Sequence, residues 1–191
     1  MESAQQLIDR ILDGDRGAFK VIIEDHQRLV HHIVGKMVSD PTDKEDLAQE
    51  VFIKVFRKLG SFRAESKLST WIAQIAFNTT VNFVQKRRPE LFGDIAGSDD
   101  ADLDCFAADL TEPDDRTARA DSDDRVREEI DQLPIQYGLV VTLYHLEEMS
   151  YREIGEILGM PDGTVKSHLF RGRKMLKDRL LNKYSQEDLC A

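Results

Sequence analysis

The stretch SYREIGEILGMPDGTVKSHLFRGRK, residues 150–174, constrains the fold more than any other part of the chain. Ser150 followed by Glu153 fits a capping box, which predicts that a helix begins here. Gly159 is a typical helix stop, and Pro161 allows a second helix to start soon afterwards. The sequence therefore predicts two short helices joined by a tight turn.

The second of these helices has two different faces. Its inward stripe, with spacings of four, three and four, consists of Val165, Leu169, Gly172 and Leu176. Its outward side and flanks carry Thr164, Lys166, Ser167, Phe170, Arg171, Arg173 and Lys174. Such side chains can neutralise phosphates, bind guanine or contact a thymine methyl. An amphipathic helix with a solvated basic face is the alternative, but cap, turn and stripe together favour a DNA-binding helix-turn-helix.

In the first of the two helices, Gly155 is unfavourable for an isolated helix, which predicts close approach by a crossing helix at this position.

Charge is spread unevenly over the chain. The formal net charge is −10, of which residues 93–123 contribute −9, residues 1–92 contribute +1 and residues 124–191 contribute −2. The stretch 93–124 is rich in Asp, Gly, Ser and Ala, so burial cannot offset its ordering entropy. We therefore expect an all-α protein of two small helical domains, at 1–92 and 125–191, joined by a flexible acidic linker. The second domain would contain the helix-turn-helix.

Residues 46–59 have the periodicity of an amphipathic helix. Its apolar face would consist of Leu47, Ala48, Val51, Phe52, Val55, Phe56 and Leu59. Its polar face would consist of Asp46, Gln49, Glu50, Lys54, Arg57 and Lys58. The pattern by itself predicts a surface helix packed on a core, and partner binding is the less direct interpretation.

Residues 67–89 predict a helix that is apolar on two opposite sides. Between these sides lies an uncharged strip of Gln74, Asn78 and Asn82. A mostly buried helix needs partners for such amides, and base edges or neighbouring helices would both serve. Lys86, Arg87 and Arg88 at its end could hold phosphates. The preceding loop, residues 60–67, could hold an unstacked base or merely connect two helices.

Several classes of function are disfavoured. Cys105 and Cys190, the only cysteines, have no metal-binding spacing and fit a reducing cytoplasm. No apolar run approaches the roughly 20 residues that span a bilayer, and the N-terminus lacks the pattern of a signal peptide. None of the histidines, His26, His31, His32, His145 and His168, has a catalytic spacing. We expect a cytoplasmic protein, not an enzyme, without membrane insertion, metal, cofactor or small-molecule substrate.

Two segments resemble the extracytoplasmic-function (ECF) group of bacterial sigma factors. DLAQEVFIKVFRKLGSFRAESKLSTWIAQIAFNT, which starts at Asp46, resembles the family's region 2. LPIQYGLVVTLYHLEEMSYREIGEILGMPDGTVKSHLFRGRKML, residues 133–176, resembles its region 4. The resemblance implies a protein that binds core RNA polymerase, directs it to promoters and helps to open the DNA. It also implies inhibition by an anti-sigma factor.

The same resemblance implies roles for individual residues. Core polymerase would be bound by Asp46, Gln49, Glu50 and Lys54. The minus-10 element would be contacted by Phe62, Arg63, Ser66, Lys67, Trp71, Asn78, Arg87 and Arg88, with the loop holding a flipped base. The minus-35 element would be contacted by Thr164, Lys166, Ser167, Phe170, Arg171, Arg173 and Lys174. The linker would run through basic channels of the polymerase.

Two positions depart from the family's pattern. His168 stands where the family often has Arg, which would weaken a phosphate contact or alter base preference. Ala64 stands where the loop often has Gly, which leaves the path of the loop open. The alternative function is a self-sufficient helix-turn-helix regulator, which would account for residues 150–174 but not for the region 2 segment.

Overall fold

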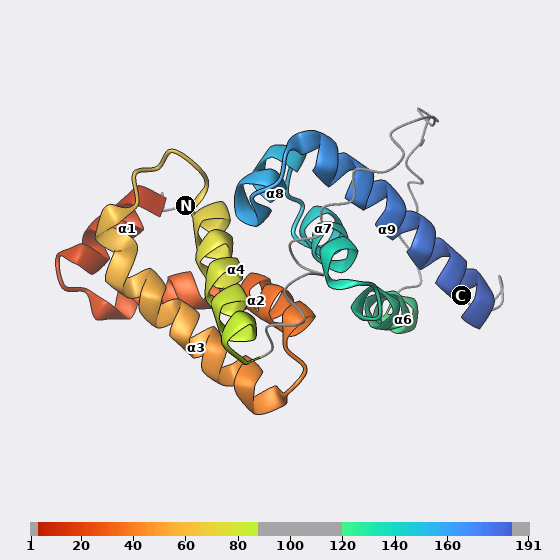
Figure 1. Ribbon diagram of the computed structural model, residues 1–191. Coiled ribbons are helices and arrows are strands. Elements are labelled where there is room, and N and C mark those ends of the chain that lie inside the picture. The colour runs from red at the N-terminus through yellow and green to blue at the C-terminus, as the bar shows by residue number, and fades with distance from the viewer. Residues whose placement is uncertain (1–3, 88–119, 185–191) are drawn as a thin grey trace.

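The computed structural model describes residues 4–87 and 120–184, and the regular elements in both ranges are helices. The first range contains α1 (Ala4–Leu12), η1 (Arg16–Ala18), α2 (Phe19–Met37), α3 (Pro41–Lys58), η2 (Leu59–Ser61) and α4 (Leu68–Arg87). The second contains α6 (Ala120–Asp131), α7 (Ile135–His145), α8 (Tyr151–Leu158) and α9 (Asp162–Lys183) (Figure 1). The all-α expectation is confirmed. Most of the expected linker lies outside the described residues, and α6 begins at Ala120, before the expected start at Arg125.

The first domain is built from α2, α3 and α4, which pack against one another in pairs. Its core includes Ile22 and Ile33 of α2, Val51 of α3 and Ile72 of α4, all fully buried. Helix α3 begins where the sequence favours a start, because Asp40 caps it and Pro41 occupies its first turn. This packing fixes the outward faces of α3 and α4.

The second domain contains the predicted helix-turn-helix in α8 and α9. The capping box is present, since the Ser150 hydroxyl accepts from the Glu153 N–H and the Glu153 carboxylate accepts from the Ser150 N–H at 2.8 Å. Gly159 ends α8 in the left-handed region, with φ 70° and ψ 32°. Helix α9 then packs across α7.

The expectation for Gly155 was wrong in its detail. A Cβ at this position would lie 2.6 Å from the carbonyl oxygen of Met160, which belongs to the turn after α8 and not to a crossing helix. Close approach of a crossing helix occurs instead at Gly172 of α9. A Cβ there would lie 2.7 Å from Cγ2 of Val141 on α7.

The two domains contact each other along two pairs of helices, α4 with α8 and α2 with α7 (Figure 1). Their buried apolar residues belong to one continuous cluster. None of the described helices combines the length and apolar composition needed to cross a bilayer.

Candidate nucleic-acid and partner interfaces

The outward face of α9 has the character that its sequence predicts. Lys166, Phe170 and Lys174 are exposed, and 46% of the Phe170 surface is accessible. The flanking residues Thr164, Ser167, Arg171 and Arg173 are half-buried. The inward stripe is buried at Val165, Leu169 and Gly172 and half-buried at Leu176. The helix therefore presents a face of cations, hydroxyls and one aromatic ring to the outside.

Arg173 is held in place by side chains of α7. Its Nε donates a hydrogen bond of 2.9 Å to Nε2 of His145, and its guanidinium lies 5.1 Å from the centre of the Tyr144 ring. Tyr144 in turn stacks on Tyr151 of α8, with ring centres 5.3 Å apart. Desolvation and the neighbouring guanidinium lower the pKa of His145, which favours the neutral ring that this hydrogen bond requires. Sequence reasoning missed these aromatic residues as supports of Arg173.

His168 does not lie on the outward face. It is 7% exposed, and its ring meets that of Tyr137 at 80° with 5.2 Å between the centres. Its spacing, three residues after the buried Val165, turns it toward α7. A ring buried in this way offers no direct contact to DNA, which fits a weakened phosphate contact better than an altered base preference. Burial and the nearby Arg171 lower its pKa.

The amide strip of α4 lies at the surface. Gln74, Asn78 and Asn82 are all exposed, whereas Ile72 and Phe77, one from each apolar side of the helix, are buried. Gln74 has a protein partner, because its Nε2 donates to the carbonyl oxygen of Glu156 on α8 at 2.9 Å. The sequence left open whether these amides contact base edges or neighbouring helices, and Gln74 contacts a neighbouring helix.

The loop before α4 is a compact turn with one strained residue. Phe62 and Trp71 pack with ring centres 5.4 Å apart, while Arg63 is exposed and Ser66 is half-buried. Ala64 has a φ of 54°, the left-handed region in which glycine is favoured and another residue costs roughly 1–2 kcal/mol. The loop therefore takes a glycine-like path despite the alanine.

Lys67 precedes α4 and Arg87 ends it, and the side chains of both residues have carboxylate partners. Lys67 Nζ lies 2.9 Å from Oε1 of Glu153 on α8. Arg87 pairs with Asp43 on α3, and its guanidinium lies 4.5 Å from the centre of the Phe83 ring. Arg88 lies outside the described residues.

Helix α3 exposes three of the four residues expected to bind polymerase. Asp46, Gln49 and Glu50 are exposed. Lys54 is half-buried, since its Nζ lies 2.7 Å from Oε1 of Glu50 and donates to the hydroxyl of Thr79 at 3.3 Å. These side chains form a polar row along one side of the helix.

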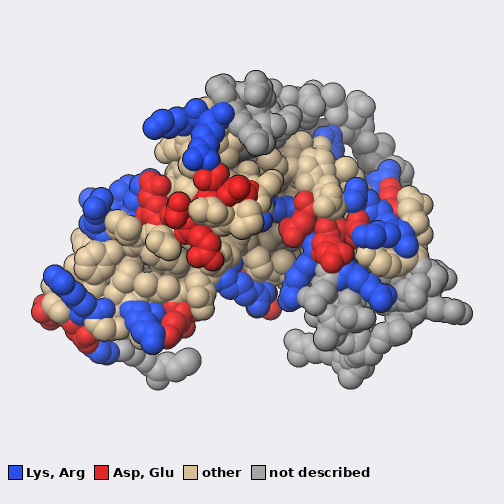
Figure 2. Space-filling view, turned by 90° about the horizontal axis from the view of Figure 1, so that it is seen from below, with Lys and Arg blue, Asp and Glu red and all other residues tan. Residues whose placement is uncertain are grey.

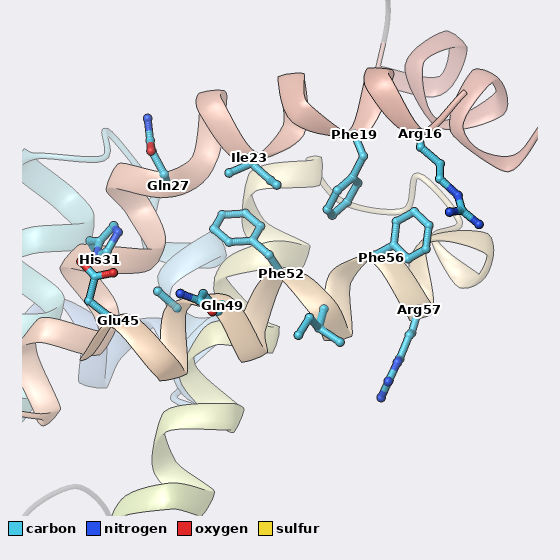
Figure 3. Close-up of a pocket in the computed structure, with 12 residues that line it drawn as sticks. Arg16, Phe19, Ile23, Gln27, His31, Glu45, Gln49, Phe52, Phe56 and Arg57 are labelled. Atoms are coloured by element: carbon cyan, nitrogen blue, oxygen red, sulfur yellow. The ribbon is translucent and has the colours of Figure 1, made fainter. Parts of the chain in front are cut away.

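A groove of about 750 Å³ runs beside this row, between α2 and α3 (Figure 3). Its walls are mainly apolar and come from Phe19, Ile23, Ala48, Phe52, Ile53 and Phe56. Arg16 and Arg57 lie at one end, and His31 and Glu45 lie at the other (Figure 3).

One residue of the groove differs from the sequence-based expectation, and a second had been assigned to neither face of the helix. Phe56 was placed on the buried face of α3, but it is 43% exposed and packs edge-on against Phe19 with 5.0 Å between ring centres. Ile53 is 50% exposed. Its position among polar residues was the signal in the sequence that α3 has a second apolar edge.

Charged side chains of both signs are mixed on the face shown in Figure 2, where several separate groups of Asp and Glu lie beside groups of Lys and Arg. The described part of the chain contains no cluster of three or more His, Cys, Asp or Glu side chains arranged to hold a metal ion. On this face of the described residues, local groups of cations and not a continuous basic track are available for contact with nucleic acid.

Comparison with known proteins agrees with this arrangement. Residues 22–90 match the family model of sigma-70 region 2, and residues 123–176 match that of sigma-70 region 4. The chain is 32% identical to the ECF RNA polymerase sigma factor SigW of Bacillus subtilis, over 91% of this chain and 94% of that one. It is 34% identical to the ECF RNA polymerase sigma-E factor of Haemophilus influenzae, over 92% of this chain and 94% of that one.

Two solved structures share the fold. RpoE of Bartonella quintana, in complex with the anti-sigma factor NepR, aligns with a TM-score of 0.61 and 23% identity over 87% of this chain and 98% of that chain. CnrH in complex with the cytosolic domain of CnrY aligns with a TM-score of 0.58 and 15% identity over 93% of this chain and 97% of that chain. With both sigma-70 regions matched in order, and relatives of this identity along nearly the whole chain, the protein belongs to the ECF group of RNA polymerase sigma factors.

Proposed function

We propose that this sigma factor directs core RNA polymerase to promoters through two DNA-binding faces. The outward face of α9 would read the minus-35 element in the major groove. The loop after η2 and the exposed amides of α4 would contact the minus-10 element, with a flipped base held near Trp71 and Phe62. The observation that carries the proposal is the pairing of a capped helix-turn-helix with an exposed amide strip in one chain of this family.

Core polymerase would dock on α3. The exposed row of Asp46, Gln49 and Glu50 offers polar contacts, and the groove beside it offers apolar area. Amphipathic helices bind in this way, with their apolar residues in a groove and their polar residues on its rim. The two arginines at one end of the groove would favour an acidic residue at the matching end of the bound helix.

An anti-sigma factor would inhibit the protein by covering the same surfaces. Support comes from the two structural neighbours. RpoE was solved with an anti-sigma factor, and CnrH was solved with the cytosolic domain of a second protein, CnrY. The proposal would fail if the protein stayed fully active in cells under every condition and after deletion of each candidate partner. In this view the protein acts in the cytoplasm and catalyses no reaction itself.

The direct test is transcription from a library of genomic fragments by purified core polymerase, with and without this protein. Start sites that depend on the protein and share two spaced upstream elements are the expected result. If no such starts appear and the protein alone binds specific DNA, a self-sufficient regulator becomes the better explanation.

A double variant tests the docking surface. Asp46→Ala with Gln49→Ala should weaken binding to core polymerase while the fold remains intact, because both side chains are exposed. Asp178→Ala with Asn182→Ala is the matched control, since it also removes one carboxylate and one amide from an exposed helical surface. Equal polymerase affinity of the two double variants would rule out α3 as the docking helix.

A further inference from the structure

The contacts between the two domains use side chains that the proposed function needs for DNA. Lys67, expected to hold the minus-10 element, pairs instead with Glu153 of α8. The hydroxyl of Thr70, a buried residue, lies 3.4 Å from the same carboxylate oxygen. Gln74, in the amide strip, donates to the carbonyl oxygen of Glu156. One edge of the minus-10 face is therefore occupied by the first helix of the helix-turn-helix.

A second group of contacts joins α2 to the other side of the second domain. Glu147, in the turn between α7 and α8, lies 2.5 Å from Nδ1 of His32 and 3.8 Å from Nε of Arg28. Arg28 also donates to the carbonyl oxygen of Leu146 at 3.1 Å. The Glu147 side chain is only 14% exposed, so these contacts are partly shielded from solvent.

Lys36 completes the second group. Its side chain is 3% exposed and reaches across to α6, where its ammonium donates to the carbonyl oxygen of Ile130 and lies 3.5 Å from Oδ1 of Asp131. Gly138 of α7 gives it room, because a Cβ at that position would lie 2.2 Å from Cε of Lys36. A buried lysine that hydrogen-bonds a carbonyl of the other domain is a specific contact and not a random collision of surfaces.

This arrangement is incompatible with simultaneous reading of both promoter elements. By their names the elements lie about 25 base pairs apart, which is roughly 85 Å of DNA at about 3.4 Å per base pair. The longest described helix, α9, has 22 residues and is therefore about 33 Å long at roughly 1.5 Å per residue. Domains joined through Lys67 and Glu153 cannot reach across that distance.

We infer that the free protein is held closed by an interdomain latch, formed by Lys67, Thr70 and Gln74 with α8 and by Arg28, His32 and Lys36 with the α6–α8 side. The inference rests on the proposed function, because it assigns the covered edge of α4 to promoter DNA. The latch blocks part of the minus-10 face and keeps the helix-turn-helix beside it. Binding to core polymerase has to separate the domains, and the free energy of that separation reduces the apparent affinity for polymerase.

Glu147→Lys is the variant of choice, because it removes the carboxylate that contacts His32 and Arg28 and places a second cation beside Arg28, without changing a residue assigned to DNA or polymerase. Glu148→Lys is the matched control, since it makes the same charge change at an exposed neighbour. Pulsed electron paramagnetic resonance would measure the distance between spin labels at Lys20→Cys and Lys177→Cys, both exposed, with Cys105 and Cys190 replaced by Ser. Circular dichroism would confirm that each full-length variant is folded.

The wild type and Glu148→Lys should give one narrow, short distance, and core polymerase should convert it to a longer one. Glu147→Lys should give a broad, longer distribution without polymerase and bind core polymerase about threefold or more tightly. A free wild type as broad as Glu147→Lys, or a short distance that persists in an active polymerase–promoter complex, would overturn the latch. Equal effects of the two lysine variants would also overturn it. If the wild type supports no polymerase-dependent transcription, the proposed function fails, whereas the distance in the free protein still decides whether the domains are latched.

Discussion

At the scale of single residues, His168 is a polar group in an apolar place. Its Nδ1 is buried and has no hydrogen-bond partner among the described residues. We predict that His168→Leu leaves promoter preference unchanged and raises the free energy of unfolding by about 1 kcal/mol, because it removes an unsatisfied polar atom. Thermal unfolding and start-site mapping would measure the two effects. A changed promoter preference would contradict the buried position.

The same residue should contribute to acid sensitivity. Its pKa is lowered in the folded state, so the unfolded chain binds more protons below about pH 6.5 and stability falls as the pH decreases from that value. His168→Leu should therefore reduce the loss of stability between about pH 6.5 and 5. Part of the loss should remain, because the pKa of His145 is lowered too. An unchanged pH profile would exclude His168 as a cause.

Phe170 is the opposite case, an apolar group in a polar place. Its exposure on α9 suits contact with a thymine methyl. We predict that Phe170→Ala weakens binding to the preferred minus-35 element by about 1 kcal/mol with little effect on folding stability, as expected of a contact with one base. Met175→Ala, which truncates another exposed apolar side chain of α9, is the control. Binding of holoenzyme to promoters with single substitutions would show whether the preference is lost at one position.

At the scale of elements, two glycines of the helix-turn-helix should respond in opposite ways to alanine. A Cβ at Gly155 would collide with a backbone carbonyl that cannot move without disrupting the turn, so Gly155→Ala should cost roughly 1–3 kcal/mol. Nothing lies within 4 Å of the corresponding atom at Gly163, so Gly163→Ala should stabilise α9 by up to about 1 kcal/mol. Chemical denaturation of both variants would compare them. If Gly155→Ala leaves the free energy of unfolding unchanged, the turn after α8 must move to make room for the methyl group.

Helix α6 is fastened to the end of α9 by one carboxylate. Glu129 is 1% exposed and pairs with Lys183 at 2.6 Å and Arg179 at 2.9 Å. The hydrogen bond from Lys183 lowers the pKa of Glu129, so this contribution to stability is present above about pH 4.5 and is lost as the pH falls below it. Glu129→Gln should lower the melting temperature at pH 7 and flatten its fall in acid. Glu128→Gln, at an exposed neighbour, should do neither.

The sequence predicted the elements better than their outward surfaces. Capping by Ser150, the stop at Gly159 and the buried stripe of α9 all follow from local chemistry, and the structure confirms them. Phe56 was placed on the wrong side, and His168 was assigned to neither face of its helix, because helical periodicity gives a face only to within about one residue. The groove could not be foreseen, since it depends on where α2 lies relative to α3.

At the scale of the whole molecule, the contacts between domains were also beyond the sequence. Lys67 and Glu153 lie 86 positions apart, and nothing in the spacing of either residue indicates the other. Lys67 lies in a loop and Glu153 lies in a capping box, so a local pattern already explains each residue. Long-range pairs of this kind follow from the packing of α4 on α8, which periodicity does not specify.

The continuous core predicts how the molecule unfolds. If the latch holds the domains together, residues 4–87 and 120–184 should melt in one cooperative transition, because opening one domain exposes apolar surface of the other. Glu147→Lys should split this into two transitions, since repulsion from Arg28 and loss of the carboxylate contact with His32 uncouple domains whose own helices still pack together. Differential scanning calorimetry would measure this, with Glu148→Lys as the control that keeps a single peak. Two separate transitions in the wild type would mean that the shared apolar contacts contribute too little to couple the domains.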